Sequence, residues 1–277
     1  MRMDQQEGGP GPDAGAEVAS LPGLQGSRLL VTAGTSGIGL ATARIFAASG
    51  ARCIVLNGRD PVRGEAVRAE LATRWPATRV DFHAADLTIE PEVARLFQRV
   101  AADHGALDAV LHCGGAQLRP ALFTDTPVAD FRPMIDGHFT AILHVCHHAV
   151  PLLERGTNAS ITVLASDAGK QATPGESLIG AAKAAAIMFV RCLAMELSRK
   201  GIRANVLTPS IVRDTKSYDR VMSGELSRKV FEKAERRARL GVPTPPDVAG
   251  LAAFLASSLA SRITGQAVSV NGGISAA

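Results

Sequence analysis

From residue 27 onward, short apolar segments alternate with longer helical segments, and this alternation constrains the fold more than any other feature of the sequence. Longer stretches with a helical pattern include 39–50, 61–75, 91–105 and 182–201. A crossover between parallel strands is right-handed, and apolar runs this continuous suit strands buried on both faces. The order therefore predicts an α/β fold, a Rossmann-like doubly wound parallel sheet with helices on both faces. The predicted strands are 28–34, 52–58, 79–86, 107–113, 160–166, 202–209 and 266–273.

The length of the chain predicts one domain. With 277 residues, of which 46% are hydrophobic, the chain can bury one large core, and we expect this domain to cover residues 26–277. Residues 1–25 are rich in glycine, proline and acidic residues, which predicts a disordered tail without the apolar core of a signal peptide. No apolar run reaches the ~18 residues of a membrane helix. The net charge of +4 is small and its basic residues are scattered, so we expect neither nucleic acid nor a membrane as a partner.

The cysteines indicate a reducing compartment. Cys53, Cys113, Cys146 and Cys192 form no CxxC pair and fall mostly in apolar segments. We therefore expect free thiols and a cytoplasmic location.

A glycine-rich turn at 31–39 follows the first predicted strand and opens a helix. Glycines allow the backbone to approach a pyrophosphate closely, and the N-terminus of the helix offers unpaired N–H groups to that anion. An ordinary strand-to-helix turn is the alternative, but the strand–turn–helix context favours a dinucleotide site. The contacts expected from this turn are Thr32, Gly34, Thr35, Ser36, Gly37, Ile38 and Gly39.

The end of the second strand suggests which dinucleotide binds. Asn57 and Arg59 stand where a carboxylate would accept a hydrogen bond from the ribose 2′-hydroxyl of NAD. A guanidinium can instead donate two hydrogen bonds to the 2′-phosphate of NADP, so Arg59 favours NADP(H) over NAD(H). The alternative for Arg59 is a solvated side chain at the start of a helix.

With these motifs in this order, residues 27–273 resemble a short-chain dehydrogenase/reductase. The family turn TGxxxGxG is matched by Thr32, Gly37 and Gly39, although Ala33 replaces its first glycine. The resemblance implies that Lys183 binds the nicotinamide ribose and that the ADLT segment contacts the adenine. The remaining cofactor contacts that it implies are Asp86, Leu87, Gly114, Pro209 and Ile211.

The same resemblance exposes departures at the reaction centre. The family's NNAG after the fourth strand is replaced by His112 and the three residues that follow it, and His138 replaces an asparagine of the fourth helix. Ile179 stands where the catalytic tyrosine belongs, so only Ser166 and Lys183 remain of the usual four residues. Loss of general acid catalysis costs typically ~10²–10⁴-fold, so an active enzyme needs another proton donor or a reaction that does not require one.

Several side chains are candidates to replace the tyrosine. His112 and His138 are acids suited to neutral pH and fall at positions that line the family's cleft, although either is equally compatible with a core position. A water held by His138 or Ser166 is a further source. Tyr218, the only tyrosine of the chain, lies in the segment that covers the substrate in this family. We take Ser166, Lys183, His138 and His112 as the candidate catalytic residues.

Glu176 receives two interpretations. It precedes Lys183 by seven residues, a separation of ~10.5 Å along a helix, and with Ile179 and Gly180 it follows the spacing of enoyl-carrier-protein reductases. To donate a proton it would have to be protonated, with its pKa raised by burial. The pattern at 173–176 also predicts a capping box with proline at the first helical position, and we favour this structural role.

Two further patterns have mainly structural interpretations. His144, His147 and His148 have a helical spacing that suits a metal, but no acidic or cysteine ligand accompanies them, so we expect no metal. Residues 224–241 predict a charged amphipathic helix that could receive a CoA phosphate or an acidic carrier protein, although a solvated face is the simpler interpretation.

Three functions remain open. The first is an NADP(H)-dependent oxidoreductase that reduces a C=O or conjugated C=C bond of a small organic or acyl-thioester substrate, with a proton source other than the usual tyrosine. The second is a catalytically silent, cofactor-binding partner subunit, and the third is a lyase or cyclase. The resemblance also implies a homodimer or homotetramer formed through the fourth and fifth helices. We favour the reductase because Ser166 and Lys183 are both present.

Overall fold

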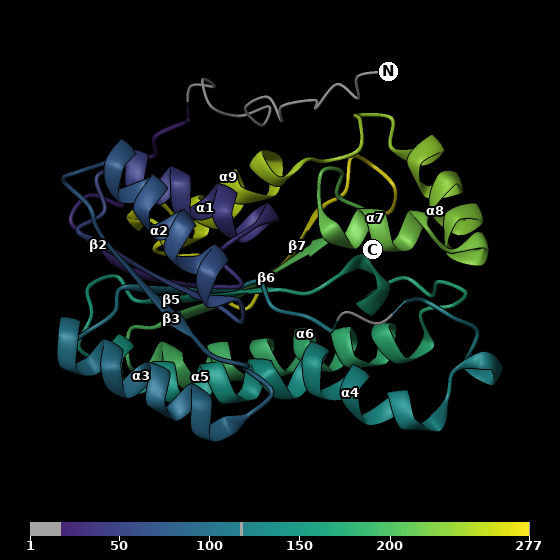
Figure 1. Ribbon diagram of the computed structural model, residues 1–277, viewed down its shortest axis with the longest axis horizontal. Helices are drawn as coiled ribbons and strands as arrows, with labels where there is room; N and C mark the ends of the chain where they lie inside the picture. Colours follow the sequence, from purple (N-terminus) through teal and green to yellow (C-terminus); the bar gives the residue numbers. More distant parts are fainter. Residues whose placement is uncertain (1–17, 117–118, 277) are drawn as a thin grey trace, which may run out of the picture.

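A seven-stranded parallel sheet forms the centre of the molecule and confirms the predicted architecture (Figure 1). The computed structural model describes residues 18–116 and 119–276. The strand order β3-β2-β1-β4-β5-β6-β7 reverses direction between β1 and β4, which is the doubly wound pattern. The strands are β1 (Arg28–Thr32), β2 (Cys53–Gly58), β3 (Arg79–Ala84), β4 (Ala109–His112), β5 (Ser160–Leu164), β6 (Arg203–Pro209) and β7 (Ala267–Val270).

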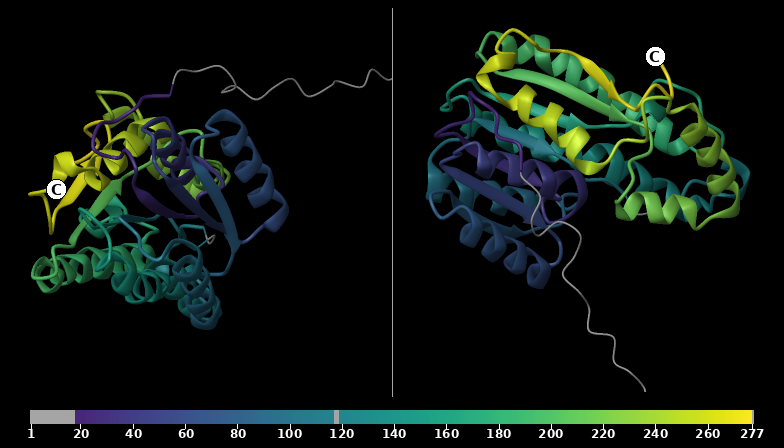
Figure 2. Two further views of the ribbon diagram at one scale, coloured as in Figure 1. Left: turned by 90° about the vertical axis from the view of Figure 1, so that its left-hand side faces the viewer. Right: turned by 90° about the horizontal axis from the view of Figure 1, so that it is seen from above.

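Helices cover both faces of the sheet (Figures 1 and 2). Successive residues of β1 point to opposite faces, so Leu30 joins one core cluster while Leu29 and Val31 join the other. One face carries α1 (Gly37–Ala48), α2 (Pro61–Arg74) and α9 (Pro245–Ala256), and the other carries α3 (Glu90–His104), α5 (Ala141–Leu153) and α6 (Ser177–Ser198).

Shorter elements gather beyond the carboxyl ends of the strands. A single helical run begins as α4 (Phe131–Ile135), widens into the π-helical turn η3 (Asp136–Thr140) and continues as α5. Such π turns often occur at functional sites. After β6, α7 (Lys216–Met222) and α8 (Glu225–Arg237) lie across this end of the sheet (Figure 1). The remaining short helices are η1 (Phe123–Asp125), η2 (Val128–Asp130), η4 (Asp167–Gly169) and η5 (Ser258–Ala260).

Residues 18–25 belong to the folded domain rather than to the predicted tail. Leu24 is fully buried in the core cluster beneath α1 and α9, and the backbone N–H of Leu21 donates to Ser49 Oγ at 2.8 Å. The chain therefore contributes to the core before residue 26. The rest of the predicted tail, residues 1–17, lies outside the described residues.

The sequence prediction that no segment is apolar and long enough for a membrane helix is wrong for α6. In length and composition this 22-residue helix could cross a membrane. Its buried residues, among them Ala186, Val190 and Ala194, pack instead in the core beneath the sheet. The apolar composition of α6 is thus explained by its place in the core.

Candidate active site

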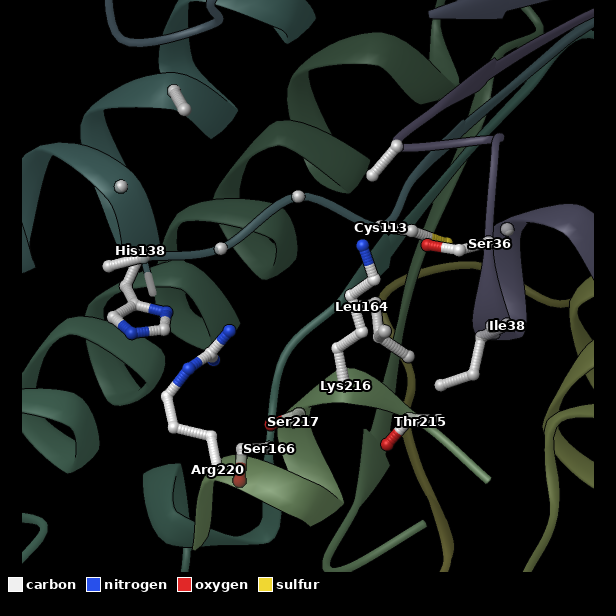
Figure 3. Close-up of a pocket in the computed structure, with 18 of the residues that line it drawn as sticks. Ser36, Ile38, Cys113, His138, Leu164, Ser166, Thr215, Lys216, Ser217 and Arg220 are labelled. Carbon is white, nitrogen blue, oxygen red and sulfur yellow. The ribbon is translucent and has the colours of Figure 1, made fainter. Parts of the chain in front are cut away.

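A cavity of about 800 Å³ lies at the carboxyl ends of the strands, beside the point where the strand order reverses. Ligands of doubly wound sheets bind at this place because the loops after β1 and β4 diverge there. The glycine-rich turn, the end of β2, the start of α6 and α7 all line the cavity. Figure 3 shows Ser36 and Ile38 of the turn and Lys216 and Arg220 of α7 beside it. Every predicted site residue lines it except Thr32, Gly34 and His112.

The glycine-rich turn has the geometry of an anion cradle. Gly37, the first residue of α1, has a φ of 51°, and a Cβ on Gly39 would lie 2.5 Å from the carbonyl oxygen of Ala33. Ser36 caps α1 without a side-chain hydrogen bond, so the first N–H groups of the helix face the cavity without that partner. The backbone here fits a bound pyrophosphate.

Thr32 and Gly34 shape this turn from beneath instead of lining the cavity. Thr32 is fully buried, and its Oγ1 accepts a hydrogen bond from Cys113 N at 3.1 Å. Gly34 N donates to Asn57 O at 2.9 Å, and a Cβ at Gly34 would lie 2.9 Å from Val31 O. Both residues hold the loops after β1, β2 and β4 together.

Two arginines line the same cavity, one directly after β2 and one on α2. Arg59 is half exposed, and its Nη1 lies 3.8 Å from Asp86 Oδ2. Arg63, which the sequence analysis missed, also lines the cavity and donates from Nε to Thr35 O at 3.1 Å. Asn57 is buried, and its Nδ2 lies 3.2 Å from two acceptors, the carbonyl oxygens of His83 and Ala85. Arg59 and Arg63 are thus available to an anion, whereas Asn57 holds the ends of β2 and β3 together.

Ser166 and Lys183 both line the cavity, and we call the part that they line its reaction end. Ser166 caps η4 and accepts from Ala168 N at 3.2 Å. Lys183, on α6, is 5% exposed and donates from Nζ to Leu164 O at 3.2 Å. Burial lowers the pKa of Lys183 to about 8, so the ammonium persists at neutral pH. Ile179 is buried one turn before Lys183 and offers only its apolar surface.

The two histidines predicted to be catalytic are both neutral, and only one of them lines the cavity. His112 is fully buried at the end of β4, with Nδ1 3.2 Å from Thr32 Oγ1, and it does not line the cavity. His138 does line it, from the π turn η3. Burial lowers the pKa of both imidazoles to about 3, so neither carries a positive charge at neutral pH. A Cβ on Gly114 would lie 3.1 Å from the His112 ring and one on Gly115 3.3 Å from the His138 ring, so both glycines make room for these rings.

Glu176 does not form the expected capping box, and this prediction is wrong. Helix α6 begins at Ser177, and the Glu176 side chain makes no capping hydrogen bond. Thr173 Oγ1 donates instead to Gln171 O at 3.2 Å. Glu176 lines the cavity together with Ser166, and burial raises its pKa to about 7.

Helix α7 supplies two basic residues that the sequence analysis missed. Figure 3 shows Lys216 and Arg220, one helical turn apart, extending into the cavity, with Arg220 directed toward His138. After burial, the charges of Lys183 and Arg220 further lower the pKa of His138. Tyr218 also lines the cavity, but its Oη donates to Glu235 Oε1 at 3.1 Å. No sequence motif marked α7, because its residues follow no spacing tied to a strand end.

The histidines of α5 are engaged elsewhere. His144 Nδ1 lies 3.0 Å from Leu87 O, and His148 Nε2 lies 2.7 Å from Glu90 Oε1. Across residues 18–116 and 119–276, no three histidine, cysteine or acidic side chains gather in a metal-binding arrangement.

Comparisons with known proteins agree with this geometry. Residues 32–275 match the family described as enoyl-(acyl carrier protein) reductase. The chain is 30% identical over 246 residues to the 3-oxoacyl-(acyl-carrier-protein) reductase FabG of Chlamydia muridarum, covering 88% of this chain and 96% of that protein.

Solved structures show the same fold. A short-chain type dehydrogenase/reductase from Mycobacterium ulcerans superposes with a TM-score of 0.83 at 28% identity, covering 90% of each chain. An NADPH-bound short chain oxidoreductase from Pseudomonas aeruginosa PAO1, described as containing an atypical catalytic center, has a TM-score of 0.81 at 26% identity and covers 91% of this chain and 97% of its own. With its fold, its cleft and its sequence in agreement, the chain is an oxidoreductase that belongs to the short-chain dehydrogenase/reductase family.

Proposed function

We propose that this chain is an NADP(H)-dependent reductase of a C=O or conjugated C=C bond in a small organic or acyl-thioester substrate, with a proton source other than tyrosine. One observation carries the proposal: a single cavity brings together the glycine-rich turn, Arg59, Ser166 and Lys183. The first two suit the phosphates of a dinucleotide, and the last two suit a reacting carbonyl group. When bound, NADP(H) supplies a hydride to a substrate carbon.

Arginines support the preference for NADP(H) over NAD(H). An ion pair as long and exposed as that of Arg59 with Asp86 contributes little, so the guanidinium is free to bind a 2′-phosphate. Arg63 lines the same end of the cavity and adds a second positive charge. The Pseudomonas aeruginosa relative, whose catalytic center is described as atypical, also binds NADPH.

The reaction end suits an oxygen that gains negative charge during reduction. Ser166 can donate its hydroxyl hydrogen to that oxygen, and the Lys183 ammonium stabilises developing charge nearby. Lys216 and Arg220 add positive potential to the same cavity, which favours substrates with an anionic group. The names of the matched family and of FabG both refer to acyl carrier protein, which supports an acyl thioester as the substrate class.

The assembly expected from the sequence maps to one surface of the domain. The fourth and fifth helices of the prediction correspond to the run from α4 to α5 and to α6. Met188 and Met195 of α6 are 57% and 73% exposed, as apolar residues of a subunit interface would be in an isolated subunit. We propose that a homodimer or homotetramer forms through these helices, and that the protein acts in the cytoplasm.

The decisive experiment measures binding and turnover separately. The purified chain should bind NADPH more tightly than NADH by fluorescence titration, and it should oxidise NADPH in the presence of some members of a panel of ketones, enones and acyl thioesters. Tight NADPH binding without oxidation by any of them would favour the silent partner subunit. Conversion of a substrate without any change in NADPH absorbance would favour the lyase or cyclase.

A further inference from the structure

Glu176 lies where two cavities of the molecule meet. The first is the cavity of about 800 Å³ described above, and the second is a cavity of about 540 Å³ between η4, the start of α6 and α8. Ser166, Glu176, Ser210 and Phe231 line both. Because Glu176 lines both cavities together with Ser166, it belongs to the part of the site where Ser166 would meet a substrate oxygen, and it also borders a second opening.

The Glu176 carboxyl has no partner among the described residues: no hydrogen bond or ion pair engages its side chain. The buried carboxylates here are paired, since Asp108 accepts three hydrogen bonds from Arg28 and Asp167 accepts from Asn271 and Ser275. Glu176 is only partly buried, and its carboxyl oxygens keep some access to the cavity. A carboxyl group that loses part of its hydration and gains no hydrogen-bond donor or cation in exchange favours the protonated form.

The charges around the two cavities do not reverse this conclusion. The titratable or charged groups of η3, η4, α6, α7 and α8 that line the two cavities are Asp136, His138, Asp167, Lys183, Lys216, Tyr218, Arg220, Lys233 and Arg237. A positive charge beside Glu176 would lower the pKa of its carboxyl group, and a negative charge would raise it. Burial is the cause of the shift, and it raises the pKa of Glu176 to about 7.

We propose that Glu176, as a neutral carboxylic acid, is the catalytic proton donor of this reductase, an assignment that rests on the function proposed above. In the reduction, one hydride and one proton add to the substrate, which gains two electrons from the cofactor. The O–H bond of Glu176 breaks as a new O–H bond forms on the carbonyl or enolate oxygen held beside Ser166. Glu176 is left as a carboxylate, which the solvent then protonates. In the oxidative direction the carboxylate accepts the proton.

The first experiment compares turnover in Glu176→Gln, Glu176→Asp and Glu225→Gln. Glutamine is similar in size but is not an acid, so we expect kcat to fall by ~10²-fold or more while the Kd of NADPH stays unchanged. Aspartate keeps the carboxylic acid and should recover part of the loss. Glu225 is exposed on α8 and paired with Lys229, so Glu225→Gln is a matched control that should keep wild-type kcat.

The pH profile gives a sharper signature than the rate alone. Wild-type kcat for reduction should fall as the pH rises through about 7, because the acid is protonated below its pKa and lost above it. Lys183 adds a second decrease near its own pKa of about 8. In Glu176→Gln the decrease near 7 should vanish while the one near 8 remains.

A second experiment needs neither cofactor nor turnover. The infrared difference between wild type and Glu176→Gln in the free protein should show a protonated carboxyl that is lost as the pH rises through about 7. The same titration appears in stability: the folded-state pKa lies above the unfolded value of 4.5, so stability is fully present below 4.5 and is lost as the pH rises through about 7. The thermal midpoint of Glu176→Gln should therefore exceed that of the wild type at alkaline pH.

The two proposals fail in different ways. A wild-type chain that binds NADPH but oxidises it with no substrate overturns the proposed function, and the role of Glu176 with it. An active wild type whose Glu176→Gln variant keeps both kcat and the decrease near pH 7 overturns the Glu176 assignment alone. A Glu176 carboxyl that is already ionised at mildly acidic pH in the infrared spectrum also overturns it, whatever the activity.

Discussion

The cavity has a cofactor end, at the glycine-rich turn and Arg59, and a reaction end, at Ser166 and Lys183. These two ends depart from the family pattern to different degrees. At the cofactor end the turn keeps Gly37 and Gly39 of the family motif, and its single departure is Ala33. At the reaction end two asparagines are replaced by His112 and His138, and the tyrosine by Ile179. The glycine-rich turn thus stays close to the family pattern, whereas the reaction end keeps only Ser166 and Lys183 of the family's usual four residues.

The contrast follows from what each end is made of. The cofactor end depends on backbone geometry, since a side chain at Gly39 would lie 2.5 Å from a carbonyl oxygen and would force the turn to move. The reaction end depends on side chains, which are exchangeable where neighbouring residues leave room for them. Gly114 leaves room for the buried ring of His112, and Gly115 leaves room for the ring of His138 in the cavity. Side chains at the reaction end can therefore change while the backbone of the glycine-rich turn is kept.

The largest effect is expected from replacing Lys183, which we propose acts at both ends, on the nicotinamide ribose and on the reacting group. Lys183→Met should lower kcat/KM by ~10²–10³-fold, because it removes a buried positive charge that would stabilise developing negative charge in the cavity. The wild type should show the same loss as the pH rises above about 8, since the ammonium is present below that pKa and deprotonated above it. Steady-state kinetics across the neutral and alkaline range measure both effects.

Lys200→Met provides the matched control for this experiment. Lys200 is half exposed and pairs with Glu154 far from the cavity, so its loss should leave kcat/KM and the pH profile unchanged. If Lys183→Met kept the alkaline decrease near 8, another group would be responsible for it, and Lys183 would not join the two ends.

The next largest effect is expected from a substitution at the cofactor end. Arg59→Glu should weaken NADPH binding by about 10- to 100-fold, because each hydrogen bond between charged groups contributes about 1.5–3 kcal/mol. NADH binding should be unchanged or tighter, since a carboxylate can accept from the ribose 2′-hydroxyl. Fluorescence titration with both nucleotides measures the change in preference.

Arg52→Glu is the control for charge alone. Arg52 is exposed at the opposite end of β2, so the same change of net charge there should leave both affinities nearly unaffected. Equal weakening of NADPH and NADH in Arg59→Glu would show that Arg59 does not distinguish the 2′-phosphate.

The same contrast explains how much of the molecule could be predicted from sequence. The sheet, its strands and the glycine-rich turn follow from local patterns, since strand periodicity and glycine geometry involve consecutive residues. Arg59 could be found because it directly follows β2. These features need no knowledge of distant contacts.

The reaction end was predicted less well because burial there depends on distant elements. The pattern at 173–176 satisfied a capping box, whereas the environment of Glu176 comes from η4, α6 and α8 together. His112 was placed in the cleft by its motif position, but its register opposite Thr32 in β1 puts its ring beneath the turn. The pairing of β1 with β4 was the signal that could have shown that the His112 ring lies outside the cavity.

A smaller effect is expected from His138. Because burial lowers its pKa to about 3, the imidazole is neutral throughout the neutral range and has no positive charge to lose. His138→Gln should therefore lower kcat by much less than the ~10²-fold loss expected when a general acid is removed. His147→Gln, on the exposed side of α5, is the matched control. A ring ¹⁵N chemical shift of His138 that titrates near neutral pH would contradict this and return the histidine to the list of donors.

The smallest effect concerns the one departure at the cofactor end. Ala33 has a φ of 48°, a left-handed conformation that costs a residue with a Cβ roughly 1–2 kcal/mol. Glycine relieves that strain but loses more entropy on folding, so Ala33→Gly should raise the free energy of unfolding by about 0.5–1 kcal/mol in denaturant titrations. Asn158→Gly, at a φ of 53°, should gain less, because asparagine adopts this conformation more readily. A destabilised Ala33→Gly would mean that packing of the Ala33 methyl group stabilises the fold by more than the backbone strain costs. A side chain would then contribute to the cofactor end as well as to the reaction end.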